Sequence, residues 1–157
     1  MSFDDDLTVS PSGRAAGNKS SPTGNQGIVA TAHRHRVSSG SPFEATFGFS
    51  RAVRVGDRVV VSGTAPVWPD GSCPDDAAVQ ARRCFTIIAD ALAQVGVSLA
   101  DVVRTRMFIT AAGDADQVGA VHGELFADIR PAATMVIVAG LLDPRWKVEI
   151  EAEAVVR

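Results

Sequence analysis

Two short runs of the sequence are apolar at every position, and they limit the folds open to the chain. They read "VVV" at 59–61 and "MVIV" at 135–138. Successive side chains of a strand point to opposite faces of its sheet, so a strand that is apolar throughout needs cover on both faces. The chain offers two amphipathic helices, which can cover only one face. We therefore expect another copy of the chain on the second face, in a dimer or trimer of closed symmetry.

Hydrophobic periodicity predicts the element order β-β-α-β-α-β-β. The first two strands are joined by the hairpin signal "GD" at 56–57. The first helix has Asp75 or Asp76 as its N-cap, and it ends at Gly96. The other three strands are predicted at 102–110, 133–140 and 146–156, and the second helix, which opens at Asp114 or Asp116, follows the first of them.

The N-terminal segment has a different composition from the rest of the chain. It is rich in Ser, Gly, Thr, Asn and Pro, as in "SPSGRAAGNKSSPTGNQG". Few apolar side chains are available there to offset the entropy lost on ordering. We expect a disordered tail over residues 1–40, followed by one domain over 41–157. The run "HRHR" at 33–36 lies in this tail, and its arginines favour a solvated basic patch over a metal site.

Charge and composition exclude several classes of protein. The net charge of −3 gives no basic face for nucleic acid. No apolar run is long enough to span a membrane, and the acidic start "MSFDDDLTVSPSG" lacks the apolar core of a secretory signal. The two cysteines, Cys73 and Cys84, make no disulfide framework, and no cluster has the spacing of metal ligands. A cytoplasmic protein without a metal is the expectation.

A few polar residues stand where they can take part in chemistry. Alternation places Glu149, Glu151 and Glu153 on one face of the last strand. The three form a solvated face, or one of them is partly buried at a subunit seam, where its raised pKa suits it to activate water. His122 lies on the inward side of the second helix, as a core residue or a site residue. Ser62-Gly63 ends a strand, as part of a turn or as a ligand contact.

Four segments carry a pattern that runs from about Phe47 to the C-terminus. They read "VGDRVVVSGTAPV", "QARRCFTIIADALAQVGVSLADVVRTRMFIT", "RPAATMV" and "KVEIEAEAV". The most specific parts are the Ser-Gly after the second strand, the Ala-Asp turn before the third, and the closing Glu-Ile-Glu-Ala. In these segments the chain resembles the Rid family, the YjgF-like reactive-intermediate deaminases.

The resemblance implies both a fold and an activity. The fold is α+β and chorismate-mutase-like, with a six-stranded mixed sheet and two helices on one face. Three copies form a homotrimeric barrel, with a small-molecule cleft at each subunit seam. Well-studied members hydrolyse the enamine or imine products of pyridoxal-phosphate enzymes to 2-keto acids and ammonia, without a cofactor or metal. In this resemblance Glu149 is the carboxylate that orients the attacking water.

The chain departs from the family pattern where the substrate is held. The family's P-x-R arginine, which grips the substrate carboxylate, is replaced by Ala133. A methyl group cannot make the paired charge-assisted bonds of a guanidinium. Met135 stands where members often have cysteine, and Phe49 where they often have tyrosine. The substrate-binding candidates are therefore Phe49, Ser62, Gly63, Ala133 and Met135, and Arg51 and Arg106 are candidate replacements for the arginine.

Two functions remain open. The first is a hydrolase or deaminase for a small substrate without a free carboxylate, in which Glu149 is the base and His122 or Ser62 assists. The second is a trimer that binds a metabolite without turnover. A third, ribonuclease activity, is disfavoured by the acidic charge. A Glu149 that is buried in the subunit seam, with a raised pKa and an ordered water, favours catalysis. A salt bridge from Glu149 to Arg106 or Arg145 favours binding or a purely structural role.

Overall fold

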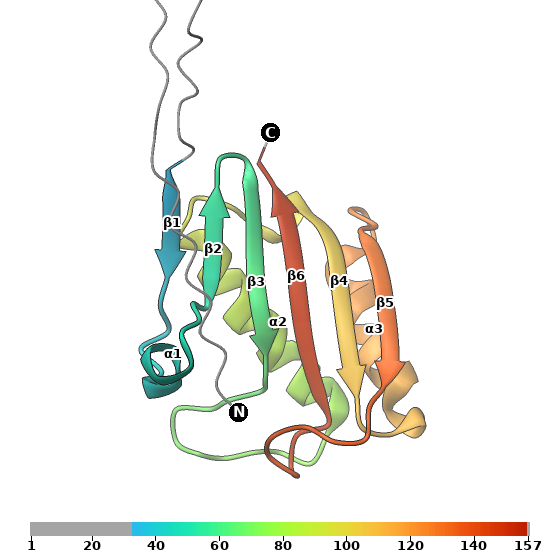
Figure 1. Ribbon diagram of the computed structural model, residues 1–157. Helices are drawn as coiled ribbons and strands as arrows, with labels where there is room; N and C mark the ends of the chain where they lie inside the picture. The colour runs from blue at the N-terminus through green and yellow to red at the C-terminus, as the bar shows by residue number, and fades with distance from the viewer. Residues whose placement is uncertain (1–32, 157) are drawn as a thin grey trace, which may run out of the picture. The chain divides into compact units, whose positions relative to one another are not determined.

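The computed structural model of the protein describes residues 33–156, within the unit Thr31–Arg157. These residues form one mixed sheet of six strands in the order β1-β2-β3-β6-β4-β5 (Figure 1). Strands β4 and β5 are parallel, and every other neighbouring pair is antiparallel. The strands are β1 (Arg34–Val37), β2 (Ala52–Val55), β3 (Arg58–Thr64), β4 (Val102–Ile109), β5 (Ala132–Ile137) and β6 (Val148–Val155).

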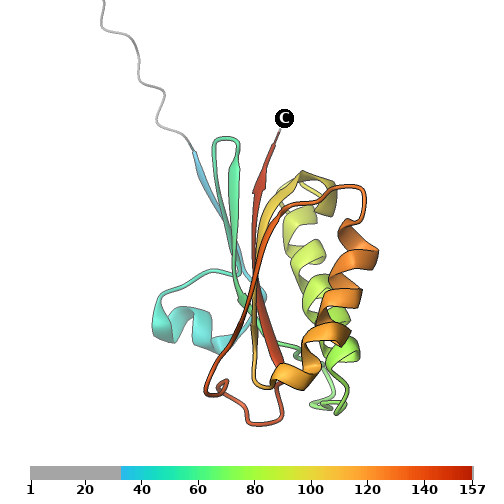
Figure 2. The ribbon, with the colours of Figure 1, turned by 90° about the vertical axis from the view of Figure 1, so that its right-hand side faces the viewer.

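The two long helices lie on the same face of the sheet, and a short helix lies on the other (Figure 2). The long helices are α2 (Ala77–Ala93) and α3 (Ala115–Phe126), and the short one is α1 (Pro42–Phe47). Single 3-10 turns, η1 (Leu99–Asp101) and η2 (Ala112–Asp114), precede β4 and α3. The predicted α+β fold, a six-stranded mixed sheet with two helices on one face, is confirmed.

The hydrophobic core lies between the sheet and α2 and α3. The side chain of Asp76 caps α2 by accepting a hydrogen bond from the Val79 amide at 2.9 Å, as the sequence predicts. Phe85, Ile88 and Leu92 of α2 are fully buried against the sheet. On β6, Val148, Ile150, Ala152 and Ala154 face this core, so the intervening glutamates face the opposite side.

The opposite side, here called the open face, mixes ion pairs with exposed valines. The carboxylate of Glu153 bonds to Arg58 at 2.7 Å and to Arg106 at 3.1 Å, and Arg106 also bonds to Glu151 at 2.6 Å. Val60 and Val136 lie on this face, each 42% exposed. The doubly apolar runs of the sequence therefore leave apolar side chains uncovered in the single chain.

The ordered domain begins earlier than the sequence predicts. Strand β1 pairs with β2 from Arg34↔Val55 to Val37↔Ala52, inside the segment 1–40 that was expected to be disordered. The boundary at residue 40 and the description of "HRHR" as part of a tail are therefore wrong. Residues 1–32 lie outside the described part of the chain. Among residues 33–156, no helix is long and apolar enough to cross a membrane.

Candidate functional site

The structure separates the predicted site residues into two groups on opposite sides of the sheet. Phe49, Ser62, Gly63 and Glu149 belong to the open face and the segment before β2. Ala133 and Met135 lie on β5, in register with Thr105 and Met107 of β4, which are buried under the helices. His122 is on α3, on the same side. Within one chain, the sheet thus stands between the two groups.

Two features determine the position of the Glu149 side chain: the alternation of side chains along β6 and the glycine at position 63 of β3. Its backbone lies opposite Phe108 of β4, and its side chain is half-buried on the open face. The register of β3 and β6 shifts between Val61 and Thr64, which brings Gly63 against the carboxylate. A Cβ at residue 63 would overlap Oε1 of Glu149 and lie 3.3 Å from its Cδ. The carboxylate of Glu149 can therefore occupy this position only because residue 63 is glycine.

The electrostatic surroundings of Glu149 favour its protonated form. Burial raises the pKa of Glu149, the positive charge of Arg51 opposes this, and the neighbouring charge of Glu151 adds to it. Within residues 33–156 the carboxylate has no hydrogen bond and no ion pair. Arg106 is engaged by Glu151 and Glu153, and Arg145 by Asp143 at 2.7 Å. Within residues 33–156, Glu149 therefore has a raised pKa and no salt bridge to Arg106 or Arg145, and its place in a subunit seam stays a prediction.

Arg51 is the positively charged residue that opposes the rise in the pKa of Glu149. Its Nη2 donates to the carbonyl oxygen of Gly63 at 2.5 Å. Its Nε is buried and has no hydrogen-bond partner in the described chain. Burial lowers the pKa of Arg51, while Glu44 and Glu149 oppose that change. Of the two candidate replacements for the family arginine, Arg51 therefore stands beside Glu149, and Arg106 does not.

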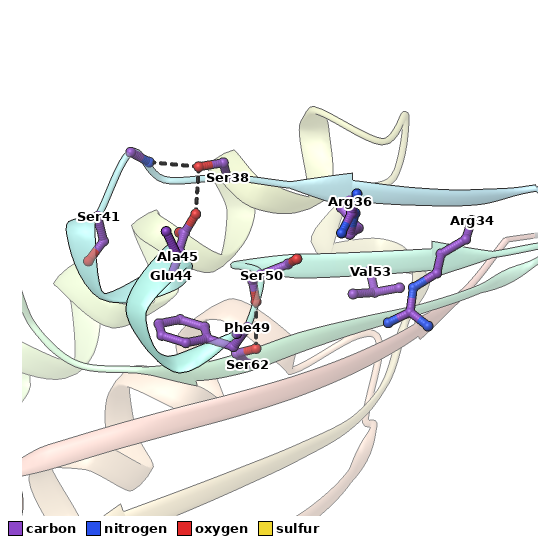
Figure 3. Close-up of a pocket in the computed structure, with 12 residues that line it drawn as sticks. Arg34, Arg36, Ser38, Ser41, Glu44, Ala45, Phe49, Ser50, Val53 and Ser62 are labelled. Atoms are coloured by element: carbon purple, nitrogen blue, oxygen red, sulfur yellow. Dashed lines mark hydrogen bonds between the residues drawn. The ribbon is translucent and has the colours of Figure 1, made fainter.

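A groove of about 690 Å³ opens between α1 and strands β1 to β3 (Figure 3). Phe49 and Ser62 line it, together with Glu44. The hydroxyl of Ser62 donates to the carbonyl oxygen of Ser50 at 2.7 Å, so its lone pairs remain for a ligand but its proton does not. We call this hollow the α1 groove. Ser62 lines this groove, and the next residue, Gly63, lies against the carboxylate of Glu149.

The second group centres on His122. Its Nε2 lies 2.9 Å from Oγ1 of Thr105 in a hydrogen bond, and its ring centroid lies 4.7 Å from that of Phe126. Burial lowers the pKa of His122, so the ring is neutral at pH 7. Thr105 is the register partner of exposed Ala133 on the edge strand. One chain thus does not bring His122 to Glu149, and the predicted cooperation of the two stays a prediction that needs a second chain.

Sequence reasoning missed two residues of the α1 groove, Arg34 and Arg36, because it assigned them to a tail. It also missed Glu44, which is 9% exposed and accepts hydrogen bonds from Ser38 and Ser39. The sequence nevertheless contains the capping residues that indicate the short helix α1. Ser41-Pro42 and Gly48 are the N-cap, the first helical residue and the left-handed C-cap of α1.

Comparison with known proteins identifies the family to which a chain of this fold belongs. Residues 40–156 match the family model described as Endoribonuclease L-PSP. The chain therefore belongs to this family, the YjgF/Rid family.

Individual relatives support the assignment. An uncharacterized protein of Streptomyces coelicolor is 42% identical over 120 residues, which cover 76% of this chain and 90% of that protein. The 2-iminobutanoate/2-iminopropanoate deaminase of Escherichia coli K12 is 33% identical over 114 residues, covering 69% and 88%. The crystal structure of Rv2704 from Mycobacterium tuberculosis, a member of the YjgF/YER057c/UK114 family, has a TM-score of 0.73 and 48% identity. It covers 79% of this chain and 100% of that one.

Proposed function

We propose that the protein is a cytoplasmic, cofactor-independent hydrolase that converts a small imine or enamine to a carbonyl compound and ammonia. The observation that carries this proposal is Glu149, a half-buried carboxylate with a raised pKa and no partner in the described chain. A structural carboxylate at such a position is normally hydrogen-bonded, because burying an unpaired charge destabilises the fold. A site for a water molecule and a substrate explains why Glu149 is not.

The proposed reaction uses Glu149 as a proton carrier. The carboxylate takes a proton from water as the water oxygen bonds to the imine carbon, and the imine nitrogen receives that proton. The carboxylate then moves the remaining hydroxyl proton to the same nitrogen, the C–N bond breaks, and ammonia leaves as the carbonyl forms. The raised pKa brings Glu149 closer to the operating pH, where a general acid–base catalyst is most effective. Phe49 supplies an apolar wall, and Ser62 an acceptor.

The proposed site lies between chains of a homotrimer. Ala133 and Met135 occupy the edge strand β5, two strands from β6 and under the helix side of the sheet. They meet a Glu149 carboxylate only if it belongs to another copy. The exposed side chains of Val136, Ile137 and Val60 are apolar surface that such a copy would cover.

The proposed substrate is not a 2-imino acid. At the edge strand, Ala133 offers no group for a carboxylate next to the imine carbon, and its neighbour Thr105 is already bonded to His122. The Escherichia coli relative is named for 2-imino acids, so we expect the two proteins to differ in substrate. The alternative is a trimer that binds such a metabolite without turnover.

Two enzyme-generated sets of imines test the proposal. An amine oxidase supplies imines without a carboxylate on the reacting carbon, and an amino-acid oxidase supplies 2-imino acids. We expect the protein to accelerate ammonia release from the first set and to act poorly on the second. Glu149→Gln should lower the rate roughly a hundredfold, and Glu153→Gln is the matched control.

Ala133→Arg should add some activity on 2-iminopropanoate, because a guanidinium restores the bidentate grip. Binding of these imines or their ketone analogues without any Glu149-dependent turnover would favour the non-catalytic alternative. Rapid hydrolysis of 2-iminopropanoate by the unmodified protein would show that another residue replaces the arginine.

A further inference from the structure

Two arginines of β1 reach the α1 groove, and neither has a partner in the described chain. Arg34 and Arg36 are two residues apart on one strand, so their side chains share a face. Arg36 is the register partner of Val53, which also lines the groove. Figure 3 shows both arginines on the groove side with Val53 and Phe49. No hydrogen bond or ion pair to either guanidinium occurs within residues 33–156.

The charge of the groove is positive once its own carboxylate is accounted for. Among residues 33–156, Glu44 is the one acidic residue that lines the groove. Its oxygens accept hydrogen bonds from the Ser38 hydroxyl at 2.5 Å, the Ser39 hydroxyl at 2.7 Å and the Ser39 amide at 2.8 Å. Burial raises the pKa of Glu44, but these bonds and Arg51 outweigh it and hold the pKa below its usual value. Glu44 is thus satisfied locally and leaves both arginines free.

Arg34 and Arg36 are separated from the carboxylate of Glu149 by several strands of the sheet. Strand β1 is separated from β6 by β2 and β3. At the ordinary strand spacing, that is about 14 Å. The α1 groove extends from Arg34 and Arg36 to Ser62. The residue after Ser62, Gly63, lies against the carboxylate of Glu149. A ligand held at both ends must therefore carry its two groups several bonds apart.

We propose that Arg34 and Arg36 bind an oxyanion, a carboxylate or phosphate, of a small molecule that lies in the α1 groove. Paired guanidinium groups suit the planar or tetrahedral oxygens of such an anion. The substrate class is then an imine or enamine whose acidic group is remote from the C=N carbon. This revises the sequence expectation of a substrate without any free carboxylate. The reacting end of that substrate rests on the proposed function, whereas anion binding does not.

The experiment titrates the full-length protein with two probes, glutarate and inorganic phosphate, at constant ionic strength and pH 7. Amide resonances in ¹H–¹⁵N spectra report both the affinity and the location. The double variant R34Q/R36Q should weaken binding at least tenfold. The matched control, R82Q/R104Q, removes the same charge from exposed residues of α2 and β4 that do not line the groove, and it should change the affinity less than twofold.

Binding of glutarate alone assigns a carboxylate, and binding of phosphate alone assigns a phosphate. Binding of neither probe, or an equal loss in both double variants, overturns the proposal. Glu149→Gln separates it from the proposed function, because this variant should keep the affinity for the probes while losing turnover. If turnover is never found but the arginine-dependent binding persists, the proposed function fails and the anion site stands.

Discussion

At the scale of single residues, Glu149 lies in surroundings that make its ionised form less stable than in water. Its pKa is raised in the folded protein, so the folded state binds the proton more tightly than the unfolded chain does. The fold therefore loses stability as the pH rises from 4.5, the usual pKa of a glutamate, through the raised folded pKa. Glu149→Gln should raise the melting temperature at pH 7 by roughly 1–4 °C, and the gain should vanish near pH 4. Thermal denaturation at the two pH values measures it.

Glu153 provides the opposite case on the same strand face. The hydrogen bond from Arg58 lowers the pKa of Glu153, and this effect outweighs burial. Its contribution to stability is present above 4.5, the usual value, and is lost as the pH falls through the lower folded pKa. Glu153→Gln should therefore lower the melting temperature at pH 7, with the deficit shrinking in acid. Two variants that shift in the same direction at pH 7 would contradict the assignment of these environments.

Gly63 is the second residue whose role is testable alone. A methyl group at this position overlaps Oε1 of Glu149, so Gly63→Ala must displace the carboxylate. We expect a loss of at least tenfold in hydrolytic rate, because a general base acts only within hydrogen-bond reach. Gly113→Ala is the control, since nothing lies within 4 Å of a Cβ there. Full activity in Gly63→Ala would show that the carboxylate's present position is not needed for the reaction.

At the scale of elements, two truncations distinguish the contribution of β1 to stability from that of the segment before it. Removing residues 1–38 deletes the four residues of β1 and the Ser38 hydroxyl bonded to Glu44. We expect the melting temperature to fall by several degrees, because β2 becomes an edge and Glu44 loses a donor. Removing residues 1–32 should leave it unchanged, as the composition of that segment predicts. Equal melting temperatures for the two truncations would show that β1 adds nothing to the fold.

The same two elements show where prediction from sequence stops. The long helices and the strands of the core have apolar side chains at regular spacing, and this spacing alone indicates which of them are helices and which are strands. Strand β1 buries Val37 alone, and α1 buries only Glu44, so neither has a periodic apolar face to find. Their positions depend on pairing with β2 and on the Ser38 and Ser39 bonds, which are tertiary contacts.

The site shows a related limit. Alternation along β6 predicts that Glu149 shares a face with Glu151 and Glu153, and this is confirmed. Alternation does not show that, within residues 33–156, Glu149 has no ion pair whereas Glu151 and Glu153 have one. That difference depends on where Arg58 and Arg106 reach from other strands. The separation of His122 from Glu149 also depends on which face of the sheet the helix covers.

At the scale of the whole molecule, a site that combines the two groups of residues would need more than one chain, as in the proposed homotrimer. Light scattering should give a mass three times the 16.4 kDa of the chain. A stable monomer at micromolar concentration would rule out a site shared between chains, and with it the proposed function in its present form. The apolar side chains left exposed on β3 and β5 would then need another explanation.

Mixed trimers test the shared site itself. Glu149→Gln removes the base from one side of each seam, and Met135→Lys places a charge on the other side. Each variant alone should be inactive. After joint refolding in equal amounts, a seam is intact when the chain that supplies Glu149 carries only the lysine and its neighbour carries only the glutamine. Random assembly in a closed ring makes about one quarter of the seams intact, so about a quarter of the normal activity should return. If both groups instead served one chain's own site, no mixture of the two inactive variants would recover any rate.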